Sequence, residues 1–303
     1  MSDARPPVFK RVKRFVRYCV IRVAIAVLSL LPIRLASGMG KLFGAFAALV
    51  ARKERRKAVE SLRTAFPQLS EGELQTRATK CFKHLGQCAF ELVCIQQLDR
   101  RLNEFIEWPA GSRAALDAAL ARKKGVLFVS GHVGHWEMLA RTVALHGYPC
   151  QTIAKETTDP RTTALIERFR ASGNLKSIWR GQSGAARSML KALKSGEILG
   201  MLIDQDTDVQ SVFVPFFGKP AKTPRAAADL AIRTEAAVIL GFCQRVGPLK
   251  YRIDMREVPL PQGDDEAAVV KLTTDMSHGI EDAIRSAPEQ WVWMHRRWKS
   301  QPP

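Results

Sequence analysis

The sequence lacks the motifs that mark several common classes of protein. It contains neither G-x-G-x-x-G nor G-x-x-x-x-G-K-[ST], so it gives no support for a dinucleotide-binding fingerprint or a P-loop. Its six cysteines include no C-x-x-C pair, which argues against a disulfide framework and a structural zinc site and suits a reducing compartment. No internal repeat or low-complexity tract suggests a solenoid or a tail. With 303 residues, 46% of them hydrophobic, the chain can nevertheless bury a large core.

The chain also lacks an uninterrupted apolar run of the roughly 20 residues that cross a bilayer. The uncharged run Val23–Ile33 has 11 residues, and a second apolar stretch covers Leu42–Val50. Residues 1–63 hold 15 Lys and Arg against 3 acidic residues, a balance of +12 in a chain of net charge +18. We therefore expect residues 1–51 to form a basic, apolar membrane anchor that either spans marginally or lies in the interface. A buried core helix with basic flanks is the alternative.

Residues 52–303 have the pattern of an α/β domain. Ser70 and Glu73 form a capping box ahead of a long amphipathic helix. Beyond it, short apolar runs alternate with helical stretches, and this alternation predicts a mainly parallel or mixed sheet flanked by helices. The expected strands cover residues 125–130, 150–154, 198–203, 237–243 and 251–255, and the expected helices run to about 146 and over 161–171, 183–194 and 224–234.

The most informative segment is Val129–Glu137, which reads V-S-G-H-V-G-H-W-E. It follows a predicted strand, and ligands of open α/β sheets bind beyond the carboxyl ends of the strands. His132 and Glu137 are about 140° out of line on one helix, so they can meet only if His132 lies in the glycine-flanked turn. In that case Glu137 can reach back, hold one imidazole tautomer and stabilise the imidazolium. We interpret His132 as a general base and His135 as a loop or substrate contact.

A second strand end carries Asp204 and Asp206, just after the apolar run Ile198–Ile203. Because no His or Cys cluster accompanies them, we expect hydrogen-bonding, positioning or substrate-binding roles, with neither a metal nor a cofactor. An ordinary polar loop is the alternative. The phenylalanines at 213, 216 and 217 either line an acyl-chain pocket or pack in the core.

Taken together, these motifs resemble those of the bacterial lipid A biosynthesis acyltransferases, the lauroyl/myristoyl family. The resemblance covers nearly the whole chain, although relatives often have Asn at the places of His135 and Asp159. It rests on the basic N-terminal region, Ala58–Pro67, Gly131–Glu137, Trp179–Gly181, Asp204–Asp206, Val212–Pro220 and Ala287–Lys299.

The resemblance implies a glycerolipid acyltransferase-like fold and transfer of a fatty acyl chain from an acyl carrier protein thioester to a hydroxyl of a lipid A precursor. His132 would deprotonate that hydroxyl, with Glu137 as its orienting partner and without a covalent acyl-enzyme. Arg180 would belong to the active site and contact the acceptor phosphate or the oxyanion. The partners implied are acyl carrier protein, an anionic lipid acceptor and the bacterial inner membrane, with the active site facing the cytoplasm.

Two alternatives remain open from the sequence. The first keeps the enzyme but changes the acceptor to another membrane lipid, such as a phosphatidylinositol mannoside. The second is a basic nucleic-acid-binding protein, because Trp291, Trp293 and Trp298 lie among basic residues that suit either a membrane interface or stacking on single strands. No recognisable nucleic-acid-binding module supports the second alternative, and it leaves the apolar N-terminal stretch unexplained.

Overall fold

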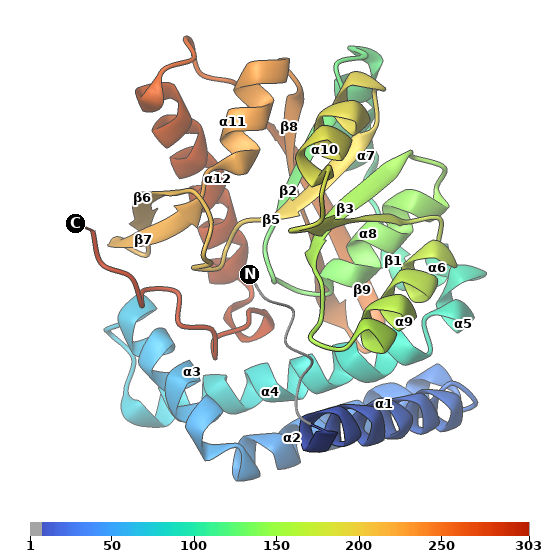
Figure 1. The fold of residues 1–303 in the computed structure, drawn as a ribbon. Helices are drawn as coiled ribbons and strands as arrows, with labels where there is room; N and C mark the ends of the chain where they lie inside the picture. The colour runs from blue at the N-terminus through green and yellow to red at the C-terminus, as the bar shows by residue number, and fades with distance from the viewer. Residues whose placement is uncertain (1–7, 303) are drawn as a thin grey trace.

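A computed structural model describes residues 8–302 and confirms the expected α/β fold, with a seven-stranded sheet at its centre (Figure 1). The strand order is β1-β9-β8-β2-β5-β3-β4, and every neighbouring pair is parallel except β8 and β9. The strands are β1 (Ile106–Glu107), β2 (Val126–Ser130), β3 (Cys150–Lys155), β4 (Lys176–Arg180), β5 (Ile198–Leu202), β8 (Ala237–Gly247) and β9 (Lys250–Val258). The sequence patterns did not predict β1 or β4.

Helices cover both faces of the sheet, as a parallel sheet requires. One face is covered by α10 (Ala185–Lys194), α11 (Ala226–Thr234) and α12 (Glu266–Ser286), and the other by α7 (Ala110–Ala121), α8 (Trp136–Leu145) and α9 (Pro160–Ala171). Alternate residues of β2 point into the two resulting cores. Leu127 and Val129 lie in the first core, under α10, α11 and α12, whereas Val126 and Phe128 lie in the second core, under α7, α8 and α9.

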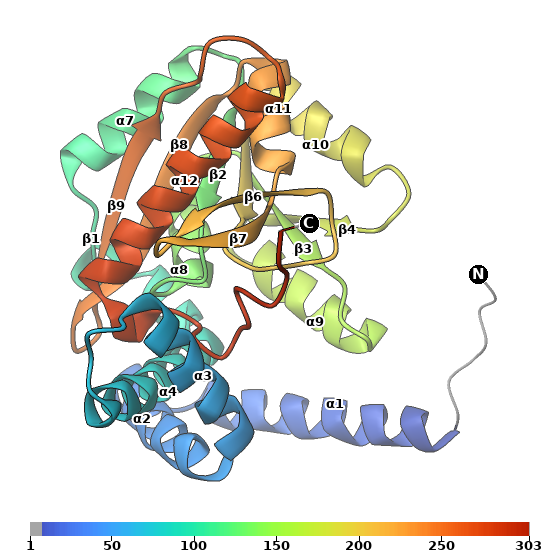
Figure 2. The ribbon, with the colours of Figure 1, turned by 90° about the vertical axis from the view of Figure 1, so that its left-hand side faces the viewer.

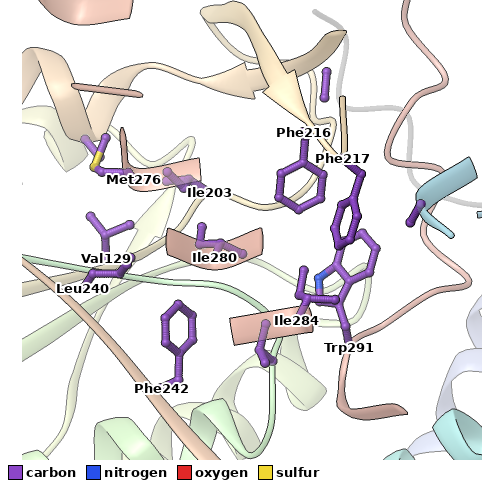
Figure 3. Packing of buried hydrophobic residues seen from close by; sticks show 14 of the residues in the cluster. Val129, Ile203, Phe216, Phe217, Leu240, Phe242, Met276, Ile280, Ile284 and Trp291 are labelled. Atoms are coloured by element: carbon purple, nitrogen blue, oxygen red, sulfur yellow. The ribbon is translucent and has the colours of Figure 1, made fainter. Parts of the chain in front are cut away.

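The first core continues beyond the sheet to a separate antiparallel hairpin of β6 (Ser211–Phe216) and β7 (Lys219–Pro224). Phe216 and Phe217 point into this core beside Trp291, as Figure 3 shows. These two rings therefore form part of the core and do not line an acyl pocket. The short 3-10 helix Pro288–Gln290 leads into the tryptophan-rich C-terminal segment.

Four helices form a layer beneath the carboxyl ends of the parallel strands (Figures 1 and 2): α1 (Val8–Leu28), α2 (Ile33–Val50), α3 (Arg52–Ala65) and α4 (Glu71–Val93). The expected capping box starts α4, since the Ser70 side chain accepts from Glu73 N–H and the Glu73 carboxylate accepts from Ser70 N–H. The apolar run Val23–Ile33 does not form one helix, because the chain turns between Leu28 and Ile33 at Pro32. Among the described residues, only Ile33–Val50 is long and apolar enough to cross a membrane.

Helix α2 packs closely on α4 through three glycines. A Cβ atom on Gly44 would lie 2.2 Å from the Phe82 carbonyl oxygen, and one on Gly40 would lie 2.5 Å from the Gly86 carbonyl oxygen. Since backbone atoms cannot move aside independently, these positions admit only glycine at the observed helix separation. The apolar N-terminal region is thus packed directly against the α/β domain.

This close packing predicts that Gly44→Ala destabilises the protein by about 1–3 kcal/mol, the usual cost of overpacking. Gly38→Ala on the same helix is the matched control, because a Cβ there meets nothing within 4 Å and alanine gains up to about 1 kcal/mol of helix propensity. Thermal unfolding of both variants in detergent measures the difference. Equal melting temperatures for the two variants would show that α2 does not pack tightly on α4.

Candidate active site

The candidate site is built on the loop between β2 and α8, which several backbone contacts hold in place. Gly134 N–H donates to the Gln290 carbonyl and His135 N–H donates to the Cys243 carbonyl, each at 2.8 Å. Gly134 has φ of +64°, and a Cβ there would lie 2.0 Å from the Cys243 carbonyl oxygen. Glycine is therefore required at this position by both conformation and space.

His132 lies in the turn before α8, as expected, and pairs with Asp204 at the end of β5. The ring Nδ1 is 2.8 Å from Asp204 Oδ1, and the His132 backbone N–H donates to Asp204 Oδ2 at 2.7 Å. The indole N–H of Trp291 donates to the same Oδ2, also at 2.7 Å. Asp204 is 1% exposed, so these three donors replace the water that a carboxylate would otherwise bind.

The pairing determines the protonation of both groups. Burial alone would lower the pKa of His132, but attraction to the Asp204 carboxylate and the hydrogen bond to it outweigh burial and raise the pKa above its ordinary value. Burial works to raise the pKa of Asp204, yet the contacts with His132 and Trp291 lower it to about 2. The ionised carboxylate thus accepts from Nδ1–H, and Nε2 carries the lone pair that can take a proton.

Glu137 does not reach the His132 ring, contrary to the expected pairing. Its carboxylate is held by Arg170 of α9, with Arg170 Nε 3.1 Å from Oε2 and Arg170 Nη2 on Oε1. Asp204 occupies the orienting position at Nδ1 instead. Glu137 still lies near enough for its charge to contribute to the raised pKa of His132.

His135 and Asp206 are buried and serve the local fold. The His135 ring caps α8 by accepting from Met138 N–H, and burial, aided by the charge of Arg245, lowers its pKa to about 3. His135 is 3% exposed, and the expected substrate contact stays a prediction. Asp206 accepts from Ser300 N–H, and its own N–H donates to the ring of His295. Both carboxylates are buried, and the roles expected for Asp204 and Asp206 from the sequence stay predictions.

A cleft of about 1190 Å³ opens beside His132 at the carboxyl ends of β3, β4 and β5. Its wall carries Arg180, as expected, together with Lys155 and Arg170. A narrower, mainly apolar cavity adjoins it and shares Trp136, Glu137 and Arg170 with the cleft. The site therefore combines the His132 imidazole, cationic side chains and an apolar cavity.

Most backbone donors near the start of α8 are already engaged. The N–H groups of Gly134, His135 and Met138 donate to Gln290, Cys243 and His135 respectively. An oxyanion in the cleft would accordingly be stabilised chiefly by the basic side chains of its wall.

The C-terminal tryptophans do not form the exposed surface that the sequence suggested. Trp291 and Trp293 are buried in the first core, and Arg297 is buried with hydrogen bonds to the Lys222 carbonyl and the Thr223 hydroxyl. Neither tryptophan can stack on nucleic acid or enter a membrane. Within residues 8–302 no group of three His, Cys, Asp or Glu side chains is placed to hold a metal ion.

Comparison with known proteins identifies the family. Residues 6–300 match the profile of a family described as bacterial lipid A biosynthesis acyltransferase. The chain is 30% identical over 280 residues to the lipid A biosynthesis lauroyltransferase of Escherichia coli (strain K12), covering 89% of this chain and 85% of that protein. It is 26% identical over 282 residues to the palmitoleoyltransferase of the same organism, covering 90% and 87%. A phosphatidylinositol mannoside acyltransferase of Mycobacterium tuberculosis (strain CDC 1551 / Oshkosh) is 26% identical over 204 residues, covering 66% and 62%.

The geometry predicts that Asp204→Asn lowers the turnover of acyl transfer by about 100-fold or more, because an amide neither fixes the tautomer nor stabilises the imidazolium. The variant also loses the attraction that raises the pKa of His132. A base must be neutral to act, so the acid limb of kcat/KM should move to lower pH. The exposed Asp208→Asn is the control. An unshifted acid limb in a folded Asp204→Asn protein would refute the pairing.

Proposed function

Since the chain belongs to the bacterial lipid A biosynthesis acyltransferase family, we propose that it transfers a fatty acyl chain from acyl carrier protein to a hydroxyl of a lipid A precursor. The observation that carries the proposal is the His132–Asp204 pair at the edge of a cleft that adjoins an apolar cavity. The reaction takes place at the inner membrane, on its cytoplasmic face.

In the proposed mechanism, Nε2 of His132 takes the proton from the acceptor hydroxyl while the hydroxyl oxygen attacks the thioester carbonyl carbon. The negative charge that develops on the carbonyl oxygen faces the basic wall of the cleft. The intermediate then collapses to the new ester and expels the carrier thiolate, which takes the proton back from the imidazolium. Asp204 stays ionised throughout and stabilises the charged ring.

Three other residues complete the proposal. Glu137 fixes Arg170 at the boundary between the cleft and the apolar cavity, because the two side chains form a nearly buried ion pair. Arg180 is exposed at the mouth of the cleft, where it suits a phosphate of the acceptor.

In this proposal the acyl chain binds in the apolar cavity. Its inner part is lined by Leu139, Val143 and Cys150, toward the amino ends of the strands, while the part shared with the cleft lies at their carboxyl ends. A linear hydrocarbon entering past Glu137 would therefore run along α8 toward Val143. The depth of this cavity would limit the length of the chain that is transferred.

Membrane association is proposed from the distribution of exposed apolar side chains. Of 18 large hydrophobic side chains exposed among the described residues, 15 lie between Phe9 and Val50, on or beside α1 and α2. Such a patch on the surface of a protein marks an interaction site. Arginines at 11, 14 and 17 of α1 accompany it and suit anionic headgroups.

The function is tested by lipid mass spectrometry of a deletion strain complemented with wild type or His132→Ala. The wild-type protein should restore one acyl chain on lipid A, and purified His132→Ala should retain about 1% or less of the turnover, since a general base contributes at least about 100-fold. His278→Ala, an exposed histidine on α12, is the matched control. Acylation of a phosphatidylinositol mannoside in place of lipid A would contradict the lipid A acceptor and support the alternative acceptor.

The acyl cavity gives a separate prediction. Val143→Phe adds bulk at the inner end, so the preferred donor should become shorter by roughly two to four carbons while short thioesters keep most of their turnover. Competition among carrier thioesters of different chain length measures the preference. A uniform loss across all lengths would indicate that the chain binds elsewhere.

A further inference from the structure

Helix α10 carries a row of basic side chains. Arg187, Lys191 and Lys194 are four and three residues apart, which places them within about 60° of one another around the helix. All three are exposed, and the helix contains no acidic residue. Among residues 8–302 none of the three forms an ion pair, whereas basic side chains at the start of the neighbouring helix α11 and on α12, such as Arg225 and Lys271, do.

The same helix forms a wall of the cleft. Ala185 and Met189 line the cleft that holds His132, and Ala192 and Leu193 are buried against the sheet. These four residues lie on the side of the helix opposite the basic row, since Arg187 is about 200° from Ala185. The basic row therefore covers the outside of a wall that is one helix thick.

The position of α10 identifies the kind of partner. The apolar surface proposed to contact the membrane lies on α1 and α2, at the bottom of both ribbon views, whereas α10 lies near the top (Figures 1 and 2). None of the exposed large hydrophobic side chains belongs to α10. A row of unpaired cations that faces away from the membrane is complementary to an acidic soluble protein.

We propose that the outer face of α10, formed by Arg187, Lys191 and Lys194, is the docking surface for the acidic carrier protein that delivers the acyl thioester. The inference rests on the proposed function and specifies where its donor binds. The carrier lies against the outside of the wall, and its thioester arm enters the cleft over the amino end of α10. Glu156 accepts a hydrogen bond from Gln182, just ahead of the amino end of α10.

The test compares two donors with the full-length enzyme in detergent. In the double variant Arg187→Glu/Lys191→Glu, kcat/KM for the acyl carrier protein should fall about tenfold or more, mainly through KM, because like charges now oppose each other. For an acyl-pantetheine thioester, which has no protein surface, kcat/KM should stay unchanged. Raising the salt concentration should weaken carrier binding to the wild type and reduce the difference between wild type and variant.

Two single variants serve as internal comparisons. Lys194→Glu, at the end of α10 far from the entrance, should have a smaller effect than Arg187→Glu. Arg233→Glu makes the same charge change at an exposed position of α11, beside a different pocket, and should have almost no effect.

The possible outcomes separate this surface from the proposed function. If the wild type acylates lipid A from the carrier and the double variant does so equally well, the docking surface is wrong and the function stands. The surface is also wrong if both donors are slowed alike, or if KM rises for the lipid acceptor instead. Failure of wild-type enzyme to bind or use the carrier, measured directly with purified acylated carrier, overturns the donor and the surface together.

Discussion

The buried carboxylate of Asp204 imposes the main constraint on this structure. An ionised group that is 1% exposed is tolerated only if hydrogen bonds replace its hydration. Two of its donors come from His132 after β2, and the third comes from Trp291, which is 87 residues after Asp204. The ends of two neighbouring strands and the C-terminal segment must therefore be in place together. The reactive geometry is accordingly a product of the complete fold.

A second buried network ties the N-terminal helices to the same fold. Glu91 of α4 is fully buried and accepts hydrogen bonds from Ser37 of α2, Arg245 of β8 and Tyr251 of β9. Removing α2 would take away one of these donors and expose the glycine surface of α4. Since breaking a buried charged network is costly, α2 contributes to the stability of the domain as well as presenting an apolar surface. The expected domain boundary at residue 51 stays a prediction. Helix α2 lies before this boundary and packs against α4, which lies after it.

Much of the fold could be predicted from the sequence because the signals are local. The strand of residues 125–130, the capping box at Ser70 and the start of α8 after a glycine-flanked turn each depend on a few adjacent residues. The partner of His132 could not be chosen in the same way. Glu137 is five residues away and Asp204 is 72, and only the order of β2 and β5 in the sheet brings the second one to the ring. The sequence feature that pointed to Asp204 as a site residue was its place at the end of a predicted strand.

The same limit explains the other differences. An aromatic and basic composition is compatible with an exposed surface, but Trp291 and Trp293 are instead buried against each other and against the rings of Phe216 and Phe217. The sequence suggests that His135 is a polar loop residue. In the structure its backbone N–H donates to Cys243 of β8, and its side chain is buried. Composition and spacing are local properties of the sequence, whereas the burial of a side chain depends on residues that are far away in the sequence. Arg170, which holds Glu137, had no sequence signal at all.

The arrangement of surfaces accounts for how two unlike substrates could meet in the proposed reaction. The carboxyl ends of the parallel strands face the layer of α1 to α4 (Figure 2), and the cleft lies at the carboxyl ends of β3, β4 and β5. A lipid acceptor that stays partly in a membrane would reach His132 from that side. The outer face of α10 points away from it, toward the water-soluble donor. The proposed acyl cavity begins at Glu137 and Arg170, between these two approaches. The thioester carbonyl would therefore lie beside Nε2 of His132, and the acyl chain would lie outside the path of the acceptor. Under the proposed function, a single fold would thus keep the lipid and the protein substrate apart and bring only their reacting atoms together.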